Sequence, residues 1–233
     1  TCYNSLGCIA SCLDVTRQDH DDWCVGHEVG HNNQGVINLE GGTEVYNNLF
    51  SNFCRFLTGN VTSSGEAFSN TMFEYAQGIP FAKRGGLMRM YYQLYLYYHL
   101  GQRNTSFFPE LFKELRKDPL TDHYKNTNNS SLKFVRKVCE IAQEDLTDFF
   151  EAWGFFKTCN NLKISDYGNY TMTVKISDIN RTKATIDKYA RKNREILFVE
   201  DRVDYVPREG YFALPGKERR DSHLVGQCGD LGQ

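Results

Sequence analysis

The sequence feature that most restricts the fold is the run His27-Glu28-Val29-Gly30-His31. Residues four positions apart lie one turn apart on an α-helix, so a helix here brings both imidazoles to one face. Asp21 or Asp22 is a suitable N-cap for that helix. Two histidines in this spacing, with a glutamate beside the first, are typical of zinc hydrolases. The run therefore predicts a helix with a metal-binding face.

The same run predicts a division of chemical roles. A catalytic zinc ion usually takes three protein ligands and keeps a fourth position for water. We expect His27 and His31 to be two of the ligands. Zinc lowers the pKa of its bound water from about 15.7 toward about 7, and Glu28 would accept the proton and pass it to the leaving amine. The pattern predicts amide hydrolysis without a covalent intermediate.

A third zinc ligand must come from further along the chain, and Glu44 is the best candidate. The segment 35–42 has glycine at both ends, which ends the first helix, and Thr43 is expected to cap a second helix over residues 44–57. A helix–turn–helix then turns Glu44 toward the histidines. Glu40 is the alternative ligand, ranked lower because it lies in the irregular segment.

Asn48 follows Glu44 by one helical turn, so we expect its side chain to hold a ligand imidazole by the free N–H. The alternative for the whole motif is that His27 and His31 are ordinary core or surface histidines. Chance alone gives the H-E-x-x-H pattern in roughly one unrelated chain of this size in a hundred. The downstream glutamate favours the metal site.

Three stretches of the chain resemble the enhancin-like metallopeptidases, which include viral enhancins and bacterial mucin-degrading proteases. Residues 27–34 and 42–48 resemble the metal-binding part of that family, and residues 146–155 resemble the end of its catalytic domain. The resemblance covers about residues 20–156.

The resemblance implies a mainly α fold, the helical lobe of a gluzincin-type zinc metallopeptidase. It implies Zn2+ bound by His27, His31 and Glu44, with Glu28 as the general base. It also implies glycoprotein substrates, typically O-glycosylated and mucin-like, in a gut or host-surface setting.

One feature departs from the family pattern. The zinc helix of the family normally follows a long N-terminal lobe whose sheet forms one wall of the cleft, whereas 26 residues precede His27 here. We interpret the chain as a fragment or processed form, the C-terminal part of a catalytic domain. We expect weak or no peptidase activity from these 233 residues alone, even with zinc bound. Full mucin turnover by the purified chain would contradict that expectation.

Composition excludes two classes of function and indicates a compartment. A net charge of −2 and a pI near 6.3 give no basic patch for nucleic acid, and no stretch approaches the roughly 18 apolar residues of a membrane helix. N-x-S/T sequons begin at Asn60, Asn104, Asn128, Asn129, Asn169 and Asn180. They favour an extracellular eukaryotic protein; the alternative, an Asn-rich bacterial surface protein, is preferred because of the family. We expect an extracytoplasmic, bacterial protein.

Helical periodicity dominates the chain as far as residue 158. Apolar residues recur at three- and four-residue intervals over 65–77, 84–101, 107–117, 130–144 and 146–152. Tyrosines crowd the segment 87–100, which favours a helix buried between others. The alternatives are that these tyrosines form a sugar-binding platform, or that one of them supplies an oxyanion donor.

The helical pattern of apolar residues ends at about residue 158. This predicts a division into a helical catalytic lobe, 1–158, and a small α+β appendage with a tail, 159–233. In the appendage, residues 170–176 alternate as a strand does, Ser177 is expected to cap a helix reaching about residue 191, and residues 196–199 form a short apolar strand. The end, from residue 207, is expected to be loop.

Three functions remain open from the sequence. The favoured one is a zinc metallopeptidase that cleaves mucin-like glycoproteins. The second is a non-catalytic glycoprotein-binding module, or an inactive fragment of such an enzyme. The third is a zinc hydrolase acting on a non-peptide amide. The sequence does not give the oligomeric state or the glycan recognised.

Overall fold

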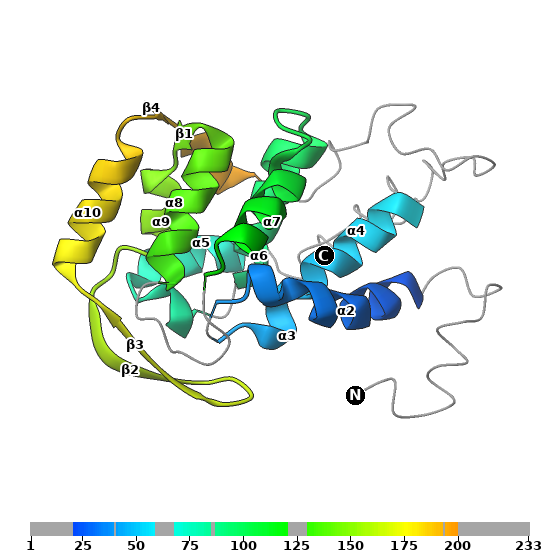
Figure 1. The fold of residues 1–233 in the computed structure, drawn as a ribbon, viewed down its shortest axis with the longest axis horizontal. Coiled ribbons are helices and arrows are strands. Elements are labelled where there is room, and N and C mark those ends of the chain that lie inside the picture. The colour runs from blue at the N-terminus through cyan, green and yellow to red at the C-terminus, as the bar shows by residue number, and fades with distance from the viewer. Residues whose placement is uncertain are drawn as a thin grey trace.

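The computed structural model describes residues 21–39, 41–58, 68–84, 87–120, 130–192 and 194–199, and most of these lie in helices (Figure 1). The predicted mainly α fold is confirmed. Glu40 and the segment from residue 207 lie outside the described residues. The α-helices are α2 (Asp21–Asn33), α3 (Thr43–Tyr46), α4 (Asn48–Thr58), α5 (Phe68–Gln77), α6 (Leu87–Leu94), α7 (Phe107–Lys117), α8 (Ser130–Ala142), α9 (Thr147–Ala152) and α10 (Ile176–Ile186).

Short turns and strands complete the described fold. The turns are η2 (Gln34–Val36), η3 (Phe81–Lys83) and η5 (Arg194–Phe198), and η4 (Tyr95–Leu100) is a π-helix. β2 (Cys159–Ser165) and β3 (Asn169–Val174) form an antiparallel hairpin, and β1 (Glu144–Asp145) pairs in parallel with β4 (Ala190–Arg191). Within the described part of the chain, no helix combines the length and apolar character needed to cross a membrane.

Glycine lets the helix of the H-E-x-x-H run lie directly against α4, beside it in Figure 1. A Cβ added at Gly30 would lie 2.6 Å from the carbonyl oxygen of Asn47, and one added at Gly26 would lie 2.6 Å from the Cα of Ser51. The two glycines are one turn apart on α2, so one face of the helix is free of side chains where α4 approaches. This contact holds the histidines close to the segment that carries Glu44.

Replacing Gly30 with alanine should therefore destabilise the protein. Because the new methyl group would meet backbone rather than a movable side chain, we expect a loss of about 1–3 kcal/mol of unfolding free energy. For a chain of this size that lowers the melting temperature by about 2–4 °C per kcal/mol. Thermal unfolding measures it, and Gly35→Ala, at an exposed position in η2, is the matched control. Equal melting temperatures for the two variants would contradict the close contact.

The tyrosine-rich segment forms the centre of the core. Tyr91, Tyr92, Tyr95, Tyr97 and Tyr98 are each at most 2% exposed, as the periodicity predicts for a buried helix. The sugar-platform alternative is wrong, because these rings pack inside the protein. The hydroxyl of Tyr91 donates to the carbonyl oxygen of Ile37 at 2.7 Å and so ties the chain after α2 to the core.

Two predicted elements near the histidines differ in their boundaries. Thr43 is the first residue of α3 and not its cap, and the helix expected over residues 44–57 breaks at Asn47 into α3 and α4. Asparagine side chains compete with the backbone for hydrogen bonds and so favour such breaks. The N-cap position is Gly42, which has no side chain to accept a hydrogen bond. The carboxylate of Asp166, from a distant part of the chain, accepts the hydrogen bonds of Thr43 that an N-cap side chain would otherwise accept.

The C-terminal elements also differ in detail. The strand over residues 159–165 escaped prediction, and Ser177 lies inside α10, whose N-cap is Lys175. α10 ends at Ile186 instead of about residue 191, and residues 196–199 lie largely in η5 instead of a strand. A short apolar run fits a buried helical turn as well as a strand, so periodicity alone does not separate the two. The division at residue 158 stays a prediction.

Candidate metal centre

Three side chains converge where α2 meets α3. His27 and His31 lie on one face of α2, with side chains 14% and 27% exposed, and Glu44 lies on α3, 48% exposed. Oε2 of Glu44 lies 3.2 Å from Nε2 of His27 and 3.6 Å from Nε2 of His31. One possible ligand atom from each of the three residues lies within 4.8 Å of the other two.

These separations fit a tetrahedral zinc ion. Zinc binds imidazole nitrogen and carboxylate oxygen at about 2.0–2.2 Å, so two ligand atoms on a tetrahedron lie about 3.4 Å apart. The nitrogen–oxygen distances of 3.2 and 3.6 Å lie on either side of that value. Two nitrogens and one oxygen are also the ligand set of several catalytic zinc sites. The three residues present therefore fit the ion that the sequence implies.

The imidazole of His27 is oriented by two asparagines. Nδ1 of His27 lies 2.7 Å from Oδ1 of Asn48, an atom that only accepts, so Nδ1 carries the proton and donates it. Nε2 of His27 is then unprotonated and carries a lone pair, and it lies 3.2 Å from Oε2 of Glu44. Nδ2 of Asn47 donates to Nε2 of both His27 and His31, at 2.9 and 3.1 Å. The Nε2 lone pairs of His27 and His31 thus face one region. A cation bound there would replace the amide of Asn47 as their partner.

His31 has a comparable partner in Gln34. Nδ1 of His31 lies 3.1 Å from the side-chain amide of Gln34, whose Oε1 is buried and lacks a hydrogen-bond partner among the described residues. A half-turn of the amide exchanges its oxygen and nitrogen. In that orientation Oε1 accepts the proton of Nδ1, and His31 has the same tautomer as His27. Both histidines then present Nε2 to the carboxylate of Glu44.

Glu44 is held in its ionised form. The hydroxyl of Tyr167 donates to Oε1, which lowers the pKa of Glu44 below its ordinary value, and partial burial opposes this without reversing it. An ionised carboxylate is the form that binds a cation. Since Oε1 is engaged by Tyr167, Oε2 is the oxygen that faces the histidines.

Glu28 lies on α2 directly after His27 and is partly buried. It is not one of the three residues of the ligand cluster, and its role beside the ion stays a prediction. Trp23, one turn before His27, stacks on that imidazole with ring centroids 5.0 Å apart and stays 40% exposed. An aromatic surface therefore borders the cluster on the side of the helix start.

Sequence reasoning missed several residues around the cluster. Asn47 had a detectable signal, because it precedes Asn48 and follows Glu44 by three positions. Tyr167 and Asp166 had none beyond a turn signal, since they lie 123 positions from the residues they bind. An oxyanion donor among the core tyrosines stays a prediction; the hydroxyl of Tyr98 is engaged, since it donates to Glu144 at 2.6 Å.

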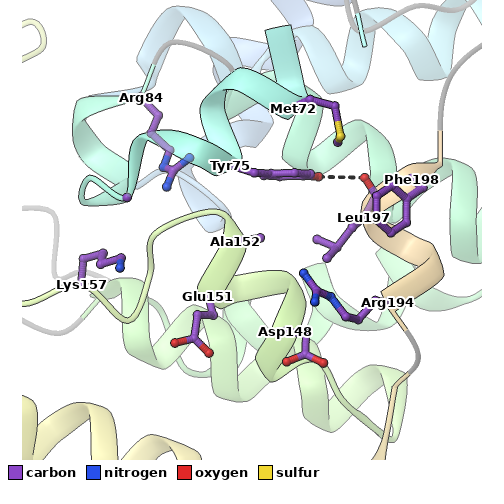
Figure 2. A pocket seen from close by; sticks show the side chains of 11 residues that line it. Met72, Tyr75, Arg84, Asp148, Glu151, Ala152, Lys157, Arg194, Leu197 and Phe198 are labelled. Atoms are coloured by element: carbon purple, nitrogen blue, oxygen red, sulfur yellow. Dashed lines mark hydrogen bonds between the residues drawn. The ribbon is translucent and has the colours of Figure 1, made fainter. Parts of the chain in front are cut away.

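A separate pocket of about 480 Å³ lies between α5, α9 and η5 (Figure 2). Figure 2 shows Arg84, Lys157 and Arg194 around it, with Tyr75 on its inner wall. The hydroxyl of Tyr75 lies 3.1 Å from the carbonyl oxygen of Leu197, and Arg84 donates to main-chain carbonyl oxygens. These groups hold the fold together. None of the described residues that line the pocket is a histidine, so the cluster on α2 is the stronger candidate for chemistry.

Comparisons with known proteins show that the chain is similar to metallopeptidases. The family model described as peptidase M60, enhancin and enhancin-like, matches residues 5–154. A solved metallopeptidase in complex with Tn antigen is 32% identical, with a TM-score of 0.72, and the match covers 81% of this chain and 36% of that one. A metallopeptidase from Bacteroides thetaiotaomicron is 29% identical, with a TM-score of 0.73, over 89% of this chain and 35% of that one.

A structure from Clostridium perfringens that includes an M60 catalytic domain matches 83% of this chain and 18% of that one, with a TM-score of 0.54 and 17% identity, which supports the fold alone. No curated protein gives a significant match. The chain spans about a third of the length of the first two structures, at 36% and 35%.

Proposed function

This chain belongs to the peptidase M60 family of enhancin and enhancin-like proteins, and on that premise we propose that it carries the zinc site of a metallopeptidase acting on O-glycosylated, mucin-like proteins. The observation that carries the proposal is the convergence of His27, His31 and Glu44, one ligand atom each within 4.8 Å. In this proposal the two imidazoles bind through Nε2 and Glu44 binds through Oε2.

Zinc held by these residues would act as a Lewis acid and lower the pKa of water at the site. Glu28 then acts as the general base: its carboxylate accepts a proton from water and later donates it to the leaving amine. Asn48 keeps the proton of His27 on Nδ1, so that Nε2 stays a lone-pair donor. No residue of the chain forms a covalent bond to the substrate in this scheme.

The proposed substrate class, O-glycosylated proteins, is based on similarity to solved structures. A structure that is 32% identical over 81% of this chain is a metallopeptidase in complex with Tn antigen, a glycan. Cleavage of glycoproteins next to a sugar is the activity that this similarity supports. An enzyme with such substrates works outside the cytoplasm, and we propose an extracytoplasmic, bacterial protein.

Zinc titration of the wild type and Glu44→Ala tests the proposal. We expect wild type to bind one Zn2+ per chain and the variant to bind at least about 100-fold more weakly, since changing even the hydrogen-bond partners of ligands costs about 10–100-fold. Glu110→Ala is the control, because that carboxylate, on α7, is 47% exposed and the carboxylate of Glu44 is 48% exposed. Equal affinities for wild type and Glu44→Ala would remove Glu44 from the ligand set, and the third ligand would be Glu40 or another residue.

A further inference from the structure

The turn of the β2–β3 hairpin lies against the segment that leads into α3, the helix of Glu44. Oδ2 of Asp166, in this turn, accepts three hydrogen bonds: from the backbone nitrogens of Gly41 and Thr43, at 3.2 and 3.0 Å, and from the hydroxyl of Thr43, at 2.8 Å. Thr43 is the first residue of α3. A carboxylate at the first turn of a helix satisfies free N–H groups and opposes the helix dipole favourably. Asp166 therefore replaces the cap that Gly42 lacks.

The next residue of the turn reaches the carboxylate itself. The hydroxyl of Tyr167 donates to Oε1 of Glu44, while Oε2 faces His27 and His31. The two oxygens of one carboxylate thus have different partners. Because Oε1 of Glu44 accepts a hydrogen bond from Tyr167, only Oε2 remains available to bind an ion.

The backbone of the turn indicates that this placement is specific. Tyr167 has φ = +51°, in the left-handed region that side-chain-bearing residues rarely occupy, although Gly168 follows directly and would suit that conformation. Its ring is 81% exposed, so burial of apolar surface does not explain the conformation. The bond to Glu44 and the neighbouring bonds of Asp166 are among the interactions that stabilise it.

We propose that the turn Asp166-Tyr167 is a positioning element of the metal site, which holds Glu44 so that it binds the ion through Oε2 alone. The inference rests on the proposed function and goes beyond it. A carboxylate that binds through one oxygen leaves the fourth position of a tetrahedral zinc ion to water, as a hydrolase needs. The hairpin, residues 159–174, lies after the part of the chain that the family model matches, 5–154.

Metal affinity tests the inference without any assay of activity. We expect Zn2+ to bind about 10–100-fold more weakly to Asp166→Asn and about 10-fold more weakly to Tyr167→Phe, the range found for partners of metal ligands. Tyr170→Phe, on β3 of the same hairpin, should bind as wild type does. Competition with a chromophoric chelator gives the dissociation constants, and circular dichroism of the metal-free proteins shows that each variant is folded.

Cobalt gives a second readout that a merely structural role would not move. Four-coordinate Co2+ absorbs visible light more strongly than five-coordinate Co2+. Without the Tyr167 hydroxyl, Oε1 of Glu44 is free to join Oε2 on the ion, so we expect weaker bands from Co2+-loaded Tyr167→Phe than from wild type. The inference would be overturned if Asp166→Asn and Tyr167→Phe kept the Zn2+ affinity and the Co2+ bands of wild type while Glu44→Ala lost Zn2+ affinity. The proposed metal site would then remain supported. Retained affinity in Glu44→Ala would instead overturn the proposed function.

Discussion

Glutamine in place of Glu28 is expected to lower the rate of peptide hydrolysis by about 10²–10⁴-fold, the usual contribution of a general base. The amide of glutamine has nearly the shape of the carboxylate but cannot accept a proton from water. Glu28 lies outside the ligand cluster of His27, His31 and Glu44, so Zn2+ affinity should change by less than about 2-fold. Loss of turnover with metal binding intact is the result that distinguishes a base from a ligand.

The measurement compares cleavage of an O-glycosylated mucin, casein and small amide substrates by wild type and Glu28→Gln. It begins with the 233-residue chain and extends to a longer form of the protein if that chain cleaves slowly. Glu110→Gln, on the surface of α7, is the matched control. Full activity in Glu28→Gln would remove Glu28 as the base. Glycoprotein binding that survives the substitution, with no turnover in any form, would favour the non-catalytic module.

The sequence predicted those parts of the site that depend on local geometry. His27 and His31 share a face of α2 because helical periodicity relates residues four positions apart. Asn48 begins α4, after the break at Asn47, and its side-chain amide donates to the carbonyl oxygen of Glu44 on α3. The hydrogen bond of Asn48 to His27, 2.7 Å long, spans 21 positions. It follows once α2 and α4 are known to lie side by side. The resemblance to enhancin-like peptidases is confirmed, as is the mainly helical fold.

The remaining parts of the site depend on contacts between distant segments. The bonds of Asp166 and Tyr167 cross 123 positions, and no periodicity in a single sequence relates residues so far apart. β2 escaped prediction for a related reason. Its residues, Cys159 to Ser165, include two asparagines and a lysine, and the strand exists through its pairing with β3. A strand of that kind is stabilised by its partner and carries little signal of its own.

Zinc is expected to raise the melting temperature of wild type, and His31→Ala should abolish that rise. Binding to the folded state alone adds about 2.7 kcal/mol when free metal is 100 times the dissociation constant. For a chain of this size the gain corresponds to roughly 5–10 °C. Removing one of three ligands leaves an imidazole and a carboxylate, which do not enclose the ion. The melting temperature of His31→Ala should therefore be the same with Zn2+ and with a chelator.

His31 suits this test better than His27. The side chain of His31 is 27% exposed, whereas His27 is 14% exposed and also packs against Trp23. Truncating His31 thus removes a ligand with less loss of packing, and metal-free wild type and variant should melt within a few degrees of each other. A rise that persists in His31→Ala at neutral pH would place the ion elsewhere and would remove the structural basis for Glu28 as a base.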